Sequence, residues 1–194
     1  MLDPFDIAEA KANLRVMSLA RRDAIPAGDR TEGSRKISSV VTPMIPAGAA
    51  VSAFLPIRSE VDLRPAVEVL SAIGHTVGLP VIDGRRLLFR AFSPAAPLVP
   101  HGFGTLGPGE DAPLVDPDVM LVPFAVFDRT LNRIGYGKAY YDITIAEIRA
   151  SGRDPLLIGV GFSVQEADHI PLEPHDVPLH RIVTEREIVL PPST

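Results

Sequence analysis

The segment VMLVPFAVFDRTLNRIGYGKAYYDITIAEIRAS, residues 119–151, decides the fold. Its first apolar run is short and bounded by polar and glycine residues, which is typical of a buried strand, so we expect a central strand over 119–122. Residues 128–138 are polar and carry glycines, which indicates a loop. Apolar residues then recur at helical spacing, which predicts a helix over about 138–151. A strand, a loop and a helix in this order are a repeating unit of α/β domains.

The same alternation continues on both sides of this segment. We expect helices over 5–25, 29–45 and 61–73, and strands over 49–55, 76–82, 87–92, 156–162, 181–184 and 187–190. Residues 93–117, which are rich in proline and glycine, and residues 163–180, with one helical turn at 164–168, are expected to be loops. Strands that alternate with helices imply a layered domain. We therefore predict that residues 1–194 form a single α/β domain with three layers, α/β/α, and a largely parallel central sheet.

The composition narrows the possible functions. The chain has 194 residues, a net charge of −5 and no cysteine. The negative charge argues against a general nucleic-acid-binding protein, and the lack of cysteine excludes disulfides and thiolate catalysis. The first residues lack the apolar core of a signal peptide, and the most apolar run, Val119 to Phe127, is too short to span a bilayer. We therefore expect a cytoplasmic protein that does not span a membrane.

The glycine-bearing loop carries the clearest chemical signal. Backbone N–H groups of such a turn can converge on an anion, and the start of a helix favours negative charge. Lys138 stands unfavourably near that helix start unless an anion is present, and Arg133 suits phosphate oxygens. The loop therefore resembles a phosphate cradle, although it lacks the spacing of a Walker A motif. The alternative is an ordinary strand-to-helix turn in which Lys138 and Asp142 form a surface ion pair.

The expected first helix carries two neighbouring stripes. The apolar stripe and the basic stripe consist of Ile7, Ala10, Leu14 and Met17, and of Lys11, Arg15 and Arg22, respectively. Side chains four and seven positions apart lie on one face of a helix. Taken alone, such a basic stripe is most often a solvated face.

Two further patterns have weaker interpretations. The segment GFGTLG, residues 102–107, matches the dinucleotide-binding pattern but lacks the strand and helix that this pattern requires. His169 and His175, which stand beside Asp168 and Asp176, suggest a transition-metal site, but such residues more often form hydrogen bonds within loops.

Several segments together resemble one known family. RIGYGKAYYD, residues 133–142, is similar to the RLGxG[GK]GYYD signature of the 5-formyltetrahydrofolate cyclo-ligase family. Further similar segments, in the same order, are KANLR (11–15), FLPIRSEVD (54–62), LP (79–80), LVPFAVFD (121–128), IGVGF (158–162), Gln165, PLEPHD (171–176) and TE (184–185). The combination is specific and covers nearly the whole chain.

The resemblance implies an ATP-dependent enzyme that closes 5-formyltetrahydrofolate into 5,10-methenyltetrahydrofolate, with release of ADP and phosphate. The residues that it assigns to ATP are Lys11, Arg15, Arg133, Ile134, Gly135, Tyr136, Gly137, Lys138, Ala139, Tyr140 and Tyr141. It implies that Leu55 and Glu60 bind the reduced folate and that Asp142 and Asp176 hold Mg²⁺. A monomer or a weak homo-oligomer is expected.

Two alternatives stay open at this point. The first is a divergent family member that binds folate or nucleotide without this turnover. The second is a related enzyme that acts on a sugar phosphate or a CoA ester. Departures from the family pattern motivate them: Ala139 replaces a usual glycine, and Gly107 stands where many members have glutamate.

Overall fold

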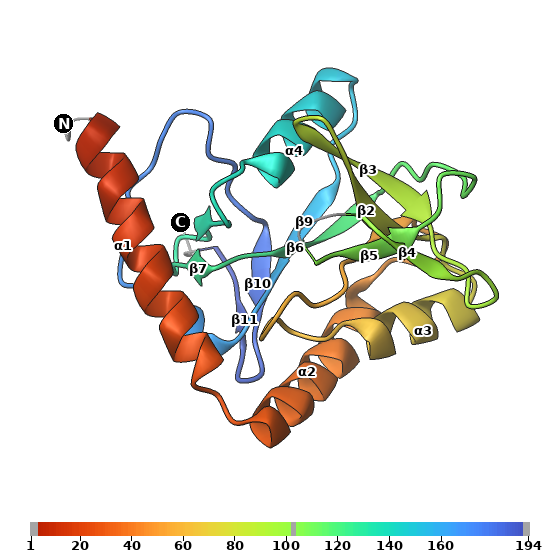
Figure 1. The fold of residues 1–194 in the computed structure, drawn as a ribbon, viewed down its shortest axis with the longest axis horizontal. Coiled ribbons are helices and arrows are strands. Elements are labelled where there is room, and N and C mark those ends of the chain that lie inside the picture. The colour runs from red at the N-terminus through yellow and green to blue at the C-terminus, as the bar shows by residue number, and fades with distance from the viewer. Residues whose placement is uncertain (1–3, 102–103, 192–194) are drawn as a thin grey trace.

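The structure, a computed structural model, describes residues 4–101 and 104–191. A seven-stranded sheet runs through the molecule in the order β11-β10-β9-β6-β1-β2-β3 (Figure 1). Its strands are β1 (Val51–Ser52), β2 (Val77–Asp83), β3 (Arg86–Ala91), β6 (Val119–Pro123), β9 (Leu156–Val160), β10 (Arg181–Val183) and β11 (Ile188–Val189). Strands β10, β9, β6, β1 and β2 are parallel, while the edge strands β11 and β3 are antiparallel to their neighbours. The prediction of a largely parallel sheet is confirmed.

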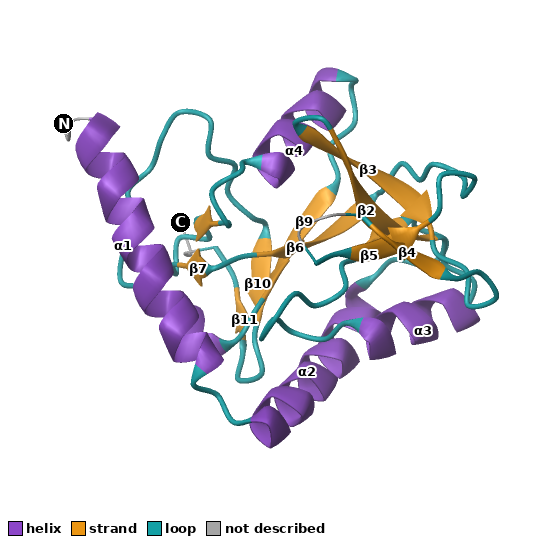
Figure 2. Cartoon of the chain, in the orientation of Figure 1, coloured by secondary structure: helices purple, strands orange, loops and turns teal. Residues whose placement is uncertain are grey.

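Helices cover both faces of the sheet, as the central strand β6 demonstrates (Figure 2). Val119 and Leu121 belong to one apolar cluster with residues of α2 (Ala27–Val41) and α3 (Arg64–Ala72). Met120 and Val122 belong to a second cluster, which includes residues of α4 (Tyr140–Ala150). Because successive strand residues point to opposite faces, these clusters are the two interfaces of a three-layer α/β/α fold. That prediction is also confirmed.

The first helix, α1 (Pro4–Asp23), packs outside these layers, against the short hairpin of β7 (Val126–Phe127) and β8 (Arg133–Ile134). The small apolar cluster at this contact consists of Leu14, Leu19, Ala125, Val126, Ile134, Ala167 and Ile170. The predicted apolar stripe is wrong at Met17, whose side chain is 60% exposed. The inner face of α1 is instead mainly polar, because Lys11, Ser18 and Arg22 are buried. The basic stripe therefore faces the protein.

The loops contain more structure than predicted. Residues 93–117 include an antiparallel hairpin of β4 (Leu98–Pro100) and β5 (Leu106–Pro108), which packs on β2. A Cβ atom at Gly107 would lie 2.9 Å from Cδ2 of His101 and 3.3 Å from the carbonyl oxygen of Pro80. A glutamate therefore does not fit at position 107 without displacing its neighbours. Residues 102 and 103 of the GFGTLG segment lie outside the described residues.

The boundaries of several elements also differ from the predictions. Strand β1 is much shorter than 49–55, and α3 begins at Arg64 rather than near residue 61, because the chain between them forms an extended loop. The second predicted helix ends in a short 3₁₀ turn, η1 (Thr42–Met44), and the predicted turn after β9 is η2 (Ser163–Gln165). None of the described helices is long and apolar enough to cross a membrane.

Candidate functional site

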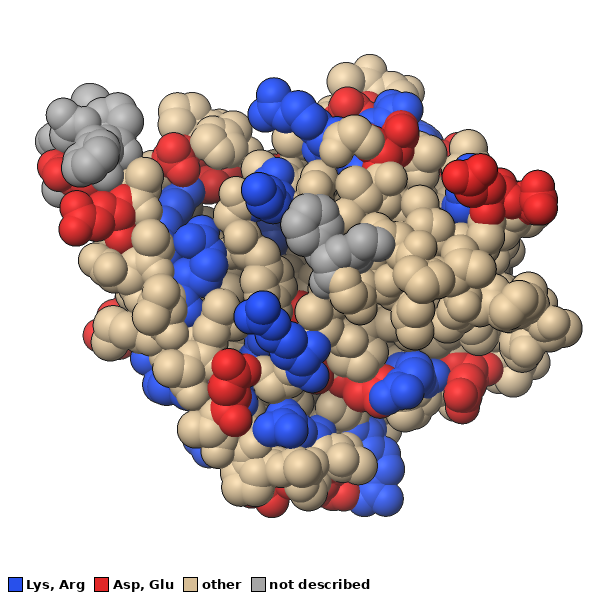
Figure 3. Space-filling view, in the orientation of Figure 1, with Lys and Arg blue, Asp and Glu red and all other residues tan. Residues whose placement is uncertain are grey.

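The predicted site residues come together beside the carboxyl ends of the parallel strands. The segment with Leu55 and Glu60 follows β1, and the glycine-bearing loop 135–139 follows β6 through the β7–β8 hairpin. Ligands of open α/β sheets bind at this edge. Helix α1 brings Lys11 and Arg15 to the same place. Lys and Arg side chains gather on the face shown in Figure 3, over the region between α1 and the sheet.

Arg15 lies against the backbone of the glycine-bearing loop at Gly135 and Gly137. Its Nε donates a hydrogen bond of 2.8 Å to the carbonyl oxygen of Gly135. A Cβ atom at Gly137 would lie 3.6 Å from the Arg15 guanidinium carbon, so the loop backbone passes over this cation. Partial burial lowers the pKa of Arg15. Residues 135–138 are exposed, so their backbone and the Lys138 ammonium are accessible to an anionic ligand.

Ala139 adopts the backbone conformation that glycine favours. Its φ and ψ angles are 52° and 19°, in the left-handed region, at the start of α4. A residue with a Cβ atom loses about 1–2 kcal/mol in this conformation. The loop thus keeps a left-handed residue where the family signature has glycine, despite the unfavourable Cβ atom. Replacement of glycine by alanine has not removed the turn.

Lys11 lies between two carboxylates. Its Nζ is 2.8 Å from Oε2 of Glu173 and 2.5 Å from Oδ2 of Asp176, and the lysine is buried. Asp176 Oδ2 also accepts the backbone N–H of Glu173 at 2.7 Å, which closes a turn over residues 173–176. Ligand atoms of Glu173, His175 and Asp176 lie within 4.8 Å of one another. The segment is therefore acidic, and Lys11 neutralises part of its charge.

Asp142 forms the second ion pair of this region. Its Oδ1 is 3.0 Å from a terminal nitrogen of Arg133, whose side chain is buried. Arg133 also donates to the Val177 carbonyl oxygen at 2.7 Å, and Asp142 accepts the Val177 N–H at 3.3 Å. Within the described chain, Asp142 therefore pairs with Arg133 and not with Lys138, so the alternative of a Lys138–Asp142 surface pair is wrong.

The residues present suit a magnesium ion in their chemistry. Asp142 and Asp176 offer carboxylate oxygens, the ligands that this hard cation prefers. Both approach the same short segment, because Asp142 accepts the N–H of Val177, the residue after Asp176. Each carboxylate is paired with a protein cation in the structure. A metal ion would therefore share these oxygens with Lys11 and Arg133 or displace them.

A buried polar network lies on the other side of the loop. Arg22, which is 1% exposed, donates from Nε to Ser59 Oγ at 2.9 Å and from Nη1 to the Tyr136 hydroxyl at 2.8 Å. Ser59 in turn donates to Asp23. Glu60 accepts the Ile57 N–H at 2.8 Å. This network joins α1, the segment after β1 and the glycine-bearing loop.

Burial governs the ionisation of the groups in this network. Burial raises the pKa of Glu60, and the Ile57 N–H, the Tyr136 hydroxyl and the positive charge of Arg22 partly oppose that shift. Burial and the nearby Glu60 charge raise the pKa of Tyr136 and of Tyr141, so both phenols are protonated at neutral pH. Burial therefore disfavours the charged form of Glu60 within this network.

The remaining predicted residues are less accessible. Ile134 is buried, and its carbonyl oxygen accepts the Ala125 N–H at 2.7 Å, so it supports the hairpin. Tyr140 and Tyr141 pack partly against the apolar cluster under α4, and Leu55 packs against the cluster of α2 and α3. These side chains shape the walls of the region more than they offer polar contacts.

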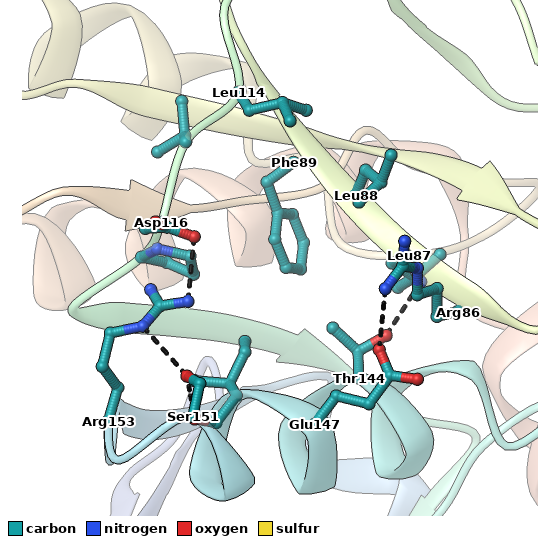
Figure 4. Close-up of a pocket in the computed structure, with 13 residues that line it drawn as sticks. Arg86, Leu87, Leu88, Phe89, Leu114, Asp116, Thr144, Glu147, Ser151 and Arg153 are labelled. Atoms are coloured by element: carbon teal, nitrogen blue, oxygen red, sulfur yellow. Dashed lines mark hydrogen bonds and ion pairs between the residues drawn. The ribbon is translucent and has the colours of Figure 1, made fainter.

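A cavity of about 210 Å³ lies elsewhere, between β3, residues 114–117 and α4 (Figure 4). None of the predicted site residues lines it. Its charged side chains pair with one another: Arg86 is 3.3 Å from Glu147, and Arg153 is 2.9 Å from Asp116. Because its charges are already balanced and it lies apart from the loop, we do not assign chemistry to this cavity.

Sequence reasoning missed three residues that the structure places in the region: Arg22, Ser59 and Glu173. Arg22 had a usable signal, since it follows Arg15 by seven positions and shares its face of α1. Ser59 and Glu173 were within similar segments but carried no spacing that pointed to Arg22 or Lys11. Their contacts span 37 and 162 positions of the chain, respectively, so no local pattern could reveal them.

Comparison with known proteins shows the family of the chain. A family model described as the 5-formyltetrahydrofolate cyclo-ligase family matches residues 7–185. The chain is 28% identical to the 5-formyltetrahydrofolate cyclo-ligase of Escherichia coli strain K12 over 176 residues, which cover 87% of this chain and 96% of the relative. The protein of the same name from Mycolicibacterium smegmatis is 27% identical over 187 residues, with 91% and 94% covered. The NMR structure of Aquifex aeolicus 5,10-methenyltetrahydrofolate synthetase is similar with a TM-score of 0.77 at 29% identity, over 92% of this chain and 91% of that one.

Proposed function

The chain belongs to the 5-formyltetrahydrofolate cyclo-ligase family, and from this we propose that it converts 5-formyltetrahydrofolate and ATP into 5,10-methenyltetrahydrofolate, ADP and phosphate. The observation that carries the proposal is the contact between the two predicted subsites. Tyr136 of the glycine-bearing loop shares the polar network of Glu60, the residue that the family resemblance assigns to the folate. A nucleotide on the loop and a folate on Glu60 would therefore be neighbours.

The proposed chemistry needs positioning rather than a protein nucleophile. A formamide carbonyl is a poor electrophile. In the first step its oxygen attacks the γ-phosphorus of ATP, and ADP leaves. In the second step N10 attacks the activated formyl carbon, the carbon–oxygen bond breaks with loss of phosphate, and N10 loses its proton. Holding reactants in the correct geometry is a large part of catalysis in such reactions.

We propose that the nucleotide side of the site consists of Lys11, Arg15, the loop 133–141, Asp142 and Asp176. Arg15 and the exposed backbone of residues 135–138 would hold the phosphates, with Lys138 as an additional cation. Magnesium, when bound to Asp142 and Asp176, would neutralise phosphate charge. Lys11, which contacts Asp176 in the structure, would add a cation beside the phosphates.

We propose that the folate side consists of Leu55 and Glu60. The pterin ring is flat and apolar, with N–H donors along one edge. A buried carboxylate such as Glu60 suits those donors, and the half-buried Leu55 suits the ring face. A cytoplasmic location and a monomeric or weakly oligomeric state are part of the same proposal.

The test is a turnover assay with purified protein, 5-formyltetrahydrofolate, ATP and magnesium. The absorbance of the methenyl product and the release of ADP are followed together, with reactions that lack the folate as the control. We expect equal amounts of both products and no ADP without the folate. Folded protein that forms no methenyl product, or that hydrolyses ATP equally well without the folate, would contradict the proposal.

A further inference from the structure

Arg22 is a buried arginine that forms its side-chain hydrogen bonds with hydroxyl groups. It is almost fully buried, yet in the described part of the chain no carboxylate lies within ion-pair distance of its guanidinium group. Its nitrogens bond to two hydroxyl groups, of Ser59 and Tyr136, and its guanidinium carbon lies 5.8 Å from the centre of the Tyr136 ring. A buried charge without a direct ion pair is costly, so the surroundings must compensate for it.

Both hydroxyl groups belong to residues beside or within the proposed subsites, and that of Ser59 also donates to Asp23. Ser59 directly precedes Glu60, and Tyr136 stands between the two glycines of the loop proposed for the nucleotide. The groups that act on Glu60 come from each neighbouring element: Arg22 from α1, Tyr136 from the loop, the Ile57 N–H from its own turn, and Tyr141 from α4. Arg22 is the cation among these groups that lowers the pKa of Glu60.

We propose that Arg22 is a positioning residue which, through Ser59 and Tyr136, holds the folate-binding carboxylate of Glu60 and the nucleotide-binding loop in one arrangement. This inference rests on the proposed function and adds to it a residue outside both predicted subsites. The Arg22 guanidinium supplies two directed hydrogen bonds and one charge. The hydrogen bonds fix the distance between the two subsites, and the charge favours the ionised form of Glu60.

The same helix offers a matched control. Arg21 is exposed, and it donates from Nε to the Val164 carbonyl oxygen at 2.7 Å and from Nη2 to the Glu166 carbonyl oxygen at 3.1 Å. It therefore also attaches α1 to the rest of the protein, but at η2 rather than at Glu60. Arg21→Met tests the loss of an arginine that anchors α1, and Arg22→Met tests the loss of the arginine that reaches the subsites.

The experiment compares steady-state kinetics of the wild type, Arg22→Met, Arg22→Lys, Tyr136→Phe and Arg21→Met across pH. We expect Arg22→Met to raise KM for 5-formyltetrahydrofolate about tenfold, as loss of a charged hydrogen bond predicts. The acidic limb of kcat/KM should move to higher pH, because Glu60 then gains a proton more easily. Arg22→Lys should show a smaller shift of the acidic limb, because lysine keeps the positive charge. Arg21→Met should leave the acidic limb where it is in the wild type.

A second measurement separates this inference from the proposed function. The carboxyl carbon of Glu60, labelled with carbon-13, is titrated by NMR in the free protein, and its pKa should be higher in Arg22→Met than in the wild type. If Arg22→Met does not fold, Tyr136→Phe carries the test, because it removes one hydroxyl group and should shift both the limb and the carboxyl pKa in the same direction. An unchanged limb and carboxyl pKa in these variants, or equal shifts in Arg21→Met, would overturn the inference. A wild type without turnover would instead overturn the proposed function.

Discussion

On the proposed nucleotide side of the site, each predicted metal-binding carboxylate pairs with a cation, Asp176 with Lys11 and Asp142 with Arg133. On the proposed folate side, Arg22 and Glu60 interact at longer range. Ion pairs of the first kind hold the charges in place until a ligand exchanges partners with them. The second arrangement leaves a buried carboxylate with a raised pKa. From this difference we expect the ion pairs of the proposed nucleotide side to rearrange when a ligand binds, and the hydrogen bonds of the proposed folate side to stay in place.

The largest expected effect tests the nucleotide side. Asp142→Asn should lower turnover at least about a hundredfold, because it removes the negative charge of a proposed metal ligand. It should also lower the melting temperature, since the buried Arg133 loses its ion-pair partner. Turnover measured well below that melting temperature separates the two effects. The control is Asp154→Asn, which breaks an exposed ion pair with Arg149; near-normal turnover in Asp142→Asn would contradict the assigned role.

A smaller effect is expected at the exposed cation of the loop. Lys138 has no ion pair within the described residues, so it is available for a phosphate. Lys138→Ala should weaken ATP binding about tenfold, which calorimetric titration would measure. Lys36→Ala, on the exposed surface of α2, is the matched control. Equal ATP affinities of the Lys138 variant and the wild type would rule out a phosphate contact.

The burial of Glu60 on the proposed folate side should make the free energy of unfolding depend on pH. The folded state raises the pKa of Glu60, so the stability that Glu60 contributes is present at low pH and is lost as the pH rises through that raised value. Glu60→Gln should therefore melt a few degrees above the wild type at neutral pH, and this gain should vanish near pH 4. Thermal melts between pH 4 and 8 measure it. Glu68→Gln, at an exposed position of α3, serves as the control. A difference in melting temperature between Glu60→Gln and the wild type that grows as the pH falls would contradict this prediction.

The smallest effect concerns the two residues of the loop with positive φ. Ala139→Gly should raise the free energy of unfolding by up to about 1 kcal/mol, and Gly137→Ala should lower it by a similar amount, because φ is 52° and 89° at these positions. Chemical denaturation measures both. Turnover of Ala139→Gly should equal or exceed that of the wild type. A large loss of turnover would show that the alanine is an adaptation of this protein.

Much of the architecture was predictable because it follows from periodicity. Apolar runs located β2, β6 and β9, and helical spacing located α4 within two residues of its observed start. The hairpin β4–β5 was missed, because its prolines and glycines are typical of loops. The inner face of α1 was misread, because its contacts are polar and depend on residues more than a hundred positions away, such as Ala125 for Ser18.

The candidate site was predictable only in part, for a related reason. The resemblance named Lys11, Asp142 and Asp176, but the ion pairs of Lys11 with Asp176 and of Asp142 with Arg133 depend on the tertiary fold. The left-handed conformation of Ala139 was not predictable from the sequence, because a single residue type does not determine φ. The position of Arg22 on the face of Arg15 was visible in the sequence, but its burial and its contacts required the structure, since a basic stripe on a helix is usually solvated.

The most direct test follows the formyl oxygen. 5-Formyltetrahydrofolate that carries oxygen-18 in its formyl group is converted with ATP, and the released phosphate is analysed by mass spectrometry. If ATP activates the formyl oxygen, the label appears in inorganic phosphate in the same amount as the methenyl product. Methenyl product accompanied by unlabelled phosphate, with the label in water, would contradict this account.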